Sequence, residues 1–162
     1  MAIVEGEKIP EVGLVEMVDG APTPVQSTAL GAGRKIVIFA VPGAFTPTCS
    51  AQHLPGFVAQ ADALRARGVD EIVCVSVNDA FVMNAWGESQ NVGGKVRMVA
   101  DGNGDLARAL GLEMDGTKFG MGQRSQRFAM IIEDNRLEKL LVESGPGLSA
   151  SSAESVLEHL GS

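Results

Sequence analysis

The sequence predicts an α/β fold in which helices cover both faces of a mixed central sheet, and two observations carry this prediction. Short apolar runs rich in β-branched residues alternate with segments whose apolar residues recur at helical spacing. Such alternation is typical of layered α/β architectures. The chain has 162 residues, of which 45% are hydrophobic, enough for one compact core. We therefore expect a single domain over residues 1–162.

The first expected elements are a β-hairpin and a buried strand. Residues 12–18 and 23–27 flank Asp19-Gly20, a pair that favours a tight turn, so they predict a hairpin near the N-terminus. Residues 35–41, KIVIFAV, form a continuous apolar run. A run of this kind is typical of a central strand that is buried on both faces.

Residues 42–49, PGAFTPTC, place Cys49 where this strand is expected to give way to a helix. Pro42 ends the strand, Thr46 is a favourable N-cap, and Pro47 is a favourable first helical residue. Cys49 then falls in the first helical turn. Unpaired backbone N–H groups and the positive end of the helix dipole favour thiolate over thiol there. The sequence thus predicts an activated cysteine, and a small buried packing residue is the alternative.

The helix that follows Cys49 is expected to be kinked. Its apolar residues recur at spacing that presents one face to the sheet, at Leu54, Phe57, Val58, Ala61 and Leu64. Pro55 removes a helical donor and clashes with the preceding turn. We therefore expect the turn that carries the cysteine to be held less firmly than the rest of the helix.

The remainder of the chain continues the alternation. The expected elements are a strand over 71–77 containing Cys74, a helix over 80–88 capped by Asn78-Asp79, a strand over 96–100, a short helix over 104–110, a glycine-rich loop over 111–123, a hairpin of strands 126–133 and 137–143, and a helix over 151–160. This order, with Cys49 at the first central strand-to-helix junction, indicates a thioredoxin-like fold. A thioredoxin has a second cysteine three positions from the first, and this chain does not, so a dithiol exchanger is not expected.

The composition limits the kinds of partner that the protein is expected to bind. The net charge of −7 argues against nucleic acid or an anionic membrane as the main partner. No segment approaches the length of a membrane span, and the first residues lack the basic and apolar regions of a secretion signal, so we expect a cytoplasmic protein. The two cysteines with His53 and His159 match no zinc pattern, so no metal is expected.

Four collinear segments carry a family resemblance over nearly the whole chain: FAVPGAFTPTCSAQHLPGF, VCVSVNDAFVMNAWG, KVRMVADGNGDLARALGL and QRSQRFAMIIED. They resemble the type II, or peroxiredoxin-five-like, peroxiredoxins of the AhpC/TSA superfamily. The resemblance implies a thiol peroxidase that reduces hydrogen peroxide and organic hydroperoxides in antioxidant defence, without haem, flavin or metal.

The resemblance also implies roles for individual residues. Cys49 matches the peroxidatic cysteine, which forms a sulfenic acid. Thr46 matches the hydroxyl that hydrogen-bonds the peroxide, and Pro42 matches a proline that shields the site. Arg127 matches the arginine that holds sulfur and oxygen while charge moves onto the leaving oxygen. The backbone N–H groups of Thr48 and Cys49 would donate to the peroxide oxygens.

Arg127 also stands out by pattern, because it opens the otherwise apolar run 127–132. A charge there needs a partner. The resemblance places that partner at the cysteine, whereas a strand-end arginine that reaches solvent is the alternative.

Other residues are ambiguous. His53, one turn after Cys49, is more consistent with packing or a surface contact than with a general base. Arg124 matches the subgroup and either supports the site or forms a surface salt bridge. In the resembled subgroup, the loop carrying Phe45 and the region 78–86 lie near the subunit contact, which implies a homodimer.

Two possibilities remain for the resolving step, in which a second thiol reacts with the oxidised Cys49. No cysteine stands in residues 147–151, near which members with a C-terminal resolving cysteine carry it. Cys74 is a possible resolving cysteine, but its apolar strand favours a buried packing thiol. We expect a one-cysteine cycle in which glutathione and glutaredoxin regenerate Cys49, with thioredoxin as the alternative reductant.

The sequence also bears on two functions outside this class. A phosphatase loop needs an arginine six residues after its cysteine, where this chain has Pro55, and a cysteine protease needs a positioned histidine base. A peroxide sensor or holdase with the same fold stays open from the sequence.

Overall fold

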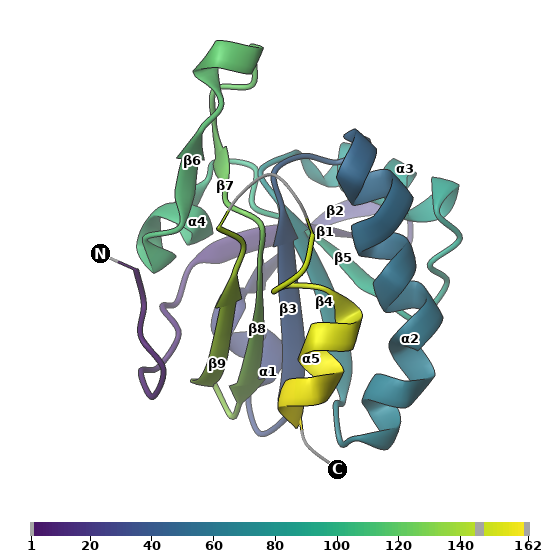
Figure 1. Cartoon of the computed structure of the whole chain (residues 1–162). Helices are drawn as coiled ribbons and strands as arrows, with labels where there is room; N and C mark the ends of the chain where they lie inside the picture. Colours follow the sequence, from purple (N-terminus) through teal and green to yellow (C-terminus); the bar gives the residue numbers. More distant parts are fainter. Residues whose placement is uncertain (1, 145–147, 161–162) are drawn as a thin grey trace.

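A mixed seven-stranded sheet forms the centre of the computed structural model, which describes residues 2–144 and 148–160 (Figure 1). The strand order is β2-β1-β5-β4-β3-β8-β9. These strands are β1 (Gly13–Val18), β2 (Ala21–Gln26), β3 (Lys35–Val41), β4 (Glu71–Ser76), β5 (Arg97–Ala100), β8 (Phe128–Glu133) and β9 (Arg136–Val142). Strands β3, β4 and β5 run parallel, and β8 pairs antiparallel to β3. The predicted mixed sheet and its N-terminal hairpin, β1–β2, are confirmed.

Helices cover both faces of this sheet. The helices are α1 (Ser27–Gly31), α2 (Leu54–Ala66), α3 (Ala80–Ser89), α4 (Asp105–Leu110) and α5 (Ala153–Leu160). Buried residues of α2, α3 and α5 form one apolar cluster with one face of the sheet, and residues of α1 and α4 join a second cluster on the other face. The predicted thioredoxin-like layering is therefore confirmed. None of the helices in the described part of the chain is long and apolar enough to span a membrane.

Strand β3 lies at the centre of both clusters. Residues 36–41 are all almost fully buried, and they alternate between the two clusters, with Phe39 on the side of α2 and Ile38 on the opposite side. This is the burial expected for a continuous apolar run in the middle of an α/β sheet. The end of β3, which leads to Cys49, is therefore packed between the two apolar clusters.

The kink expected near Pro55 takes the form of a π-helical turn. Residues Cys49–His53 are π-helical, α2 follows from Leu54, and the Leu54 N–H donates to the Cys49 carbonyl. Pro55 has no N–H to continue the bonding pattern, and the wider turn accommodates it at the start of α2. The Trp86 indole N–H donates to Ser50 Oγ at 3.0 Å and ties this turn to α3.

Several expected boundaries differ from the structure. The expected loop over 111–123 contains the strand β6 (Glu113–Asp115) and a 3₁₀ turn (Thr117–Phe119), and β6 pairs with β7 (Gln123–Ser125) in a separate hairpin that stands away from the main sheet in Figure 1. Helix α1 was not expected. The C-terminal helix begins at Ala153 instead of residue 151. These short elements carry too few residues to give a periodic pattern.

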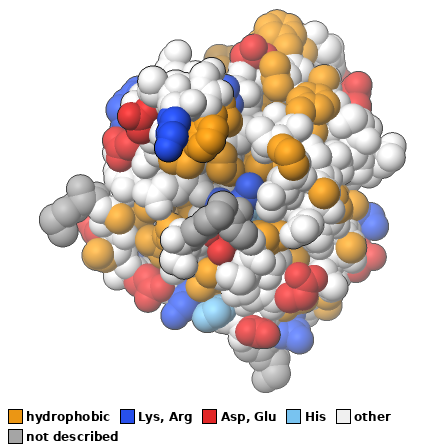
Figure 2. Space-filling view, turned by 45° about the horizontal axis from the view of Figure 1, so that its top comes forward, with side chains coloured by type: hydrophobic (Ala, Val, Ile, Leu, Met, Phe, Trp, Pro, Cys, Tyr) orange, Lys and Arg blue, Asp and Glu red, His pale blue; other side chains and the backbone are white. Residues whose placement is uncertain are grey.

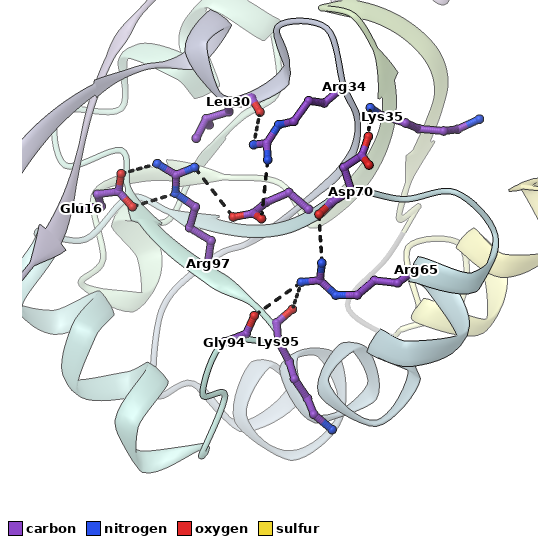
Figure 3. Close-up of polar contacts among 10 residues, drawn as sticks. Glu16, Leu30, Arg34, Lys35, Arg65, Asp70, Gly94, Lys95 and Arg97 are labelled. Atoms are coloured by element: carbon purple, nitrogen blue, oxygen red, sulfur yellow. Dashed lines mark hydrogen bonds and ion pairs between the residues drawn. The ribbon is translucent and has the colours of Figure 1, made fainter.

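Charged side chains connect the thinly paired part of the sheet (Figure 3). Strands β1 and β5 share only the register pair Val15↔Ala100. Arg97 on β5 makes a bidentate contact with Glu16 on β1, with Nε to Oε1 at 2.8 Å, and also lies 3.8 Å from Glu71 on β4. This bidentate contact gives β1 and β5 a second, directional connection beside their single backbone register pair.

Candidate active site

Cys49 lies at the junction between β3 and α2, as expected from the sequence, and its side chain is fully buried. The loop that leads to it is held by Asn78, whose Oδ1 accepts a hydrogen bond from the Ala44 N–H at 3.0 Å. The next residue, Phe45, has a φ of 67°, a left-handed conformation that is unfavourable for a bulky side chain. The tight reversal brings Thr46 back over the cysteine.

Two side chains contact the Cys49 sulfur. Thr46 Oγ1 lies 2.8 Å from Sγ, and it also lies 2.7 Å from the Gly43 carbonyl oxygen. Because a hydroxyl has one proton, Thr46 can donate to only one of these acceptors at a time. The Arg127 guanidinium donates to Sγ through Nη2 at 3.1 Å. The structure therefore brings together three of the residues singled out in the sequence.

Arg127 is buried, with 9% of its surface exposed, so the alternative of a strand-end arginine that reaches solvent is wrong. It directly precedes β8, and its backbone carbonyl accepts from the Glu143 N–H at 3.0 Å. Within the described ranges, Arg127 forms no ion pair with a carboxylate. A buried cation requires a counter-charge, and the Cys49 sulfur is the group in contact that can become an anion.

His53 is part of the site, a role that the sequence reasoning missed. Its Nδ1 lies 2.8 Å from Arg127 Nη1, and its Nε2 lies 2.9 Å from the Ser151 carbonyl oxygen. The ring is buried against Phe39 and Phe57, at centroid distances of 4.9 Å and 5.6 Å. The expected packing role is confirmed, and the expected surface contact is wrong.

The protonation of His53 follows from these partners. Burial, and then the positive charge of Arg127, lower the pKa of His53 to about 3, so the ring is neutral at physiological pH. The Ser151 carbonyl can only accept, which puts the proton on Nε2, and the guanidinium can only donate, which makes Nδ1 the acceptor. Both ring nitrogens are occupied, so His53 is not placed to act as a general base.

Arg124 connects the β6–β7 hairpin to the loop before Cys49. Its Nε donates to the Met121 carbonyl at 3.0 Å, and its Nη1 lies 3.4 Å from the carbonyl oxygen of the half-buried Pro42. A Cβ on Gly43 would stand 3.1 Å from the same guanidinium, so glycine permits this close approach. Of the two readings of Arg124, support for the site fits these contacts, since no salt bridge to Arg124 is present among the described residues.

Cys74 is fully buried on β4 and belongs to the same apolar cluster as Cys49. Cys49 and Cys74 are not joined by a disulfide in this structure. Burial, and secondarily the charge of Cys49, raise the pKa of the Cys74 thiol well above its ordinary value. These surroundings favour a packing thiol over a reactive one.

Figure 2 shows one face of the molecule, on which hydrophobic side chains gather around a hollow that holds Lys or Arg atoms. A separate cavity of about 560 Å³ lies between α3 and strands β1 and β5, and none of the site residues lines it. In residues 2–144 and 148–160, no three His, Cys, Asp or Glu side chains converge as metal ligands.

Comparisons with known proteins agree with this geometry. A family model described as Redoxin matches residues 4–157. Peroxiredoxin-2E-2, chloroplastic, of Oryza sativa subsp. japonica is 50% identical over 98% of this chain and 72% of its own length. Peroxiredoxin-2B of Arabidopsis thaliana is 49% identical, with 82% of each protein covered.

A solved structure is also close. The crystal structure of reduced Prx3 in complex with hydrogen peroxide from Vibrio vulnificus superposes with a TM-score of 0.94 at 49% identity, and covers 98% of this chain and 99% of that one.

The cytoplasmic location expected from the N-terminal residues is wrong by this comparison. Two relatives that match over 98% of the chain, from Oryza sativa and Arabidopsis thaliana, are chloroplastic peroxiredoxins. The lack of a basic or long apolar N-terminal segment did not predict the compartment.

We predict that His53 makes the protein less stable in mild acid. Its pKa is about 3 when folded and 6.5 when unfolded, so between these values the unfolded chain binds more protons. The free energy of unfolding then falls as pH falls, by up to about 1.4 kcal/mol per pH unit. Denaturant unfolding at pH 7 and pH 5 should show a loss of roughly 2 kcal/mol in the wild type.

The matched variants are His53→Gln, in which most of this loss should disappear, and His159→Gln, in which it should persist. An equal loss in His53→Gln and wild type would contradict the prediction.

Proposed function

The chain belongs to the redoxin family as a peroxiredoxin, and we propose that Cys49 is the peroxidatic nucleophile through which it acts. Membership of this family makes the protein a thiol peroxidase of antioxidant defence. The observation that carries the proposal is the buried Arg127 guanidinium, whose contacts are the Cys49 sulfur and a neutral imidazole. This pairing supports a thiolate at Cys49.

The chemistry follows from the positions of the donors. The Cys49 thiolate attacks one peroxide oxygen, an S–O bond forms, the O–O bond breaks, and the leaving oxygen takes a proton and departs as water or an alcohol. The hydroxyl of Thr46 can turn from the Gly43 carbonyl to the peroxide. Arg127 stabilises the negative charge that develops on the leaving oxygen.

Two further roles complete the proposal. The backbone N–H groups of Thr48 and Cys49 donate to the bound peroxide. Pro42 limits the access of water, which the half-burial of its side chain supports. The substrates are hydrogen peroxide and organic hydroperoxides, and the reaction needs no metal or organic cofactor.

We propose further that the reductant comes from outside the chain. Glutathione attacks the Cys49 sulfenic acid, an S–S bond forms, and water leaves; a glutaredoxin thiol then reduces the mixed disulfide. The burial of Cys74 supports this cycle, because a fully buried thiol with a raised pKa is a poor nucleophile towards the sulfenic acid. Thioredoxin is the alternative reductant.

The proposal extends to a homodimer. Phe45 and Phe81 are 54% and 63% exposed, and the Phe45 ring lies 6.4 Å from that of Trp86. Exposed aromatic side chains are enriched at protein interfaces. Light scattering at micromolar concentration should give the mass of a dimer, and a monomer mass would contradict this extension.

Substitution of Arg127 by Ala is the direct test of the proposed site. Loss of the guanidinium removes the counter-charge of the thiolate and the stabilisation of the leaving oxygen. The rate constant for peroxide reduction should fall by about 100-fold or more while the far-UV circular dichroism stays unchanged. Arg136→Ala is the matched control, because Arg136 is exposed and contacts the Gly6 carbonyl. A peroxide rate near the wild-type value in Arg127→Ala would refute the assignment.

The reductant is tested by mass spectrometry of the intact protein after one equivalent of peroxide. With glutathione present, we expect a glutathione adduct on Cys49, because the buried Cys74 thiol does not compete for the sulfenic acid. Without glutathione, we expect a sulfenic acid or its further oxides. A product that has lost two hydrogens and links Cys49 to Cys74 would instead assign Cys74 as the resolving cysteine.

A further inference from the structure

A chain of hydrogen bonds runs from the Cys49 sulfur through Arg127 and His53 to the turn that precedes α5, and it ends at a carboxylate outside the site. We propose that Glu143 is a positioning residue of the peroxide-reducing site, which acts through Ser151 and His53 on Arg127. The proposal rests on the proposed function of Cys49. It adds a residue that is remote in sequence and does not touch the sulfur.

Glu143 directly follows the end of β9 and gathers the turn over residues 149–151. Its Oε2 accepts from the Ser151 N–H at 2.7 Å, from Ser151 Oγ at 2.7 Å and from the Ser149 N–H at 2.9 Å. Its Oε1 accepts from Ser149 Oγ at 3.2 Å. Four donors therefore converge on one carboxylate.

The charge of Glu143 matters for this arrangement. Burial alone would raise its pKa, but the hydrogen bonds from the turn outweigh burial and lower the pKa, so the group is ionised and can only accept. No ion pair to Glu143 occurs in the described residues, and the hydrogen bonds that its carboxylate accepts come from the turn. An amide in its place would direct an N–H₂ group at some of the same donors.

The turn and the guanidinium together determine the tautomer of His53. The Ser151 carbonyl holds the proton on Nε2, which leaves the Nδ1 lone pair as the acceptor for Arg127 Nη1. If that carbonyl moves away, the tautomer with the proton on Nδ1 becomes accessible. Its N–H would face the N–H of the guanidinium, and Arg127 would lose the acceptor that directs Nη2 at the sulfur.

Glu143 is connected to Arg127 by a second route as well. The backbone N–H of Glu143 donates to the Arg127 carbonyl at 3.0 Å. Glu143 thus holds the main chain of Arg127 through its backbone N–H. Its carboxylate holds the turn that orients the Arg127 side chain through His53. By contrast, Glu154 is exposed in the first turn of α5, and it provides a matched control in the same part of the chain.

The test is the isosteric substitution Glu143→Gln, examined by two measurements. Stopped-flow oxidation of Cys49 by hydrogen peroxide should slow by about tenfold, the effect typical of a residue that orients a contacting group. Nitrogen-15 NMR of the histidine side chains should show the wild-type His53 with its proton on Nε2, and a mixture of tautomers in Glu143→Gln. Glu154→Gln should leave both measurements unchanged.

A double-mutant cycle distinguishes positioning from general stabilisation. If Glu143 acts through His53, Glu143→Gln should cause little further slowing in a His53→Gln background. Ser151→Ala, which removes one donor and keeps the carbonyl, should remain folded and slow oxidation by only about two- to threefold.

Three results would overturn the proposal: a wild-type rate in Glu143→Gln, an unchanged His53 tautomer in that variant, or a full additional loss in the His53→Gln background. If the wild type itself failed to reduce peroxide, the proposed function would fail, whereas the tautomer measurement would still report on the link from Glu143 to His53.

Discussion

Arg127 holds a positive charge in the interior between a sulfur atom and a neutral imidazole, and the arrangement of the site depends on this contact. An isolated ion in an apolar interior is costly, so the groups around it must supply either a counter-charge or acceptors. His53 supplies an acceptor at 2.8 Å, and Cys49 supplies the atom that can become an anion at 3.1 Å. The guanidinium thereby couples the stability of the folded site to the reactive form of the cysteine.

The sheet topology explains how these groups meet. Strand β3 carries the chain to Cys49, and β8, which follows Arg127, is its antiparallel neighbour, with Ala40 paired to Phe128. The end of β3 and the start of β8 therefore lie side by side. The π-helical turn then directs both Cys49 and His53 towards the same guanidinium. The C-terminal turn closes the opposite side of His53 through the Ser151 carbonyl.

Much of this could be predicted from the sequence, because its signals are local. The apolar run before Pro42 and the turn residues after it place Cys49 at a strand-to-helix junction, and the lone charge at the start of an apolar strand marks Arg127. The role of His53 could not be predicted in this way, since its two hydrogen-bond partners lie 74 and 98 positions further along the chain. The π-helical turn was also missed, because Pro55 predicts a kink without specifying how the backbone accommodates it.

With Cys49 as the proposed nucleophile and Cys74 as a packing thiol, a single-turnover titration compares the two cysteines most directly. Without added reductant, the wild type and Cys74→Ser should each consume hydrogen peroxide rapidly in proportion to the protein present, and Cys49→Ser should consume none on that time scale. Rapid consumption by Cys49→Ser, or its loss in a folded Cys74→Ser variant, would contradict these roles of the two cysteines.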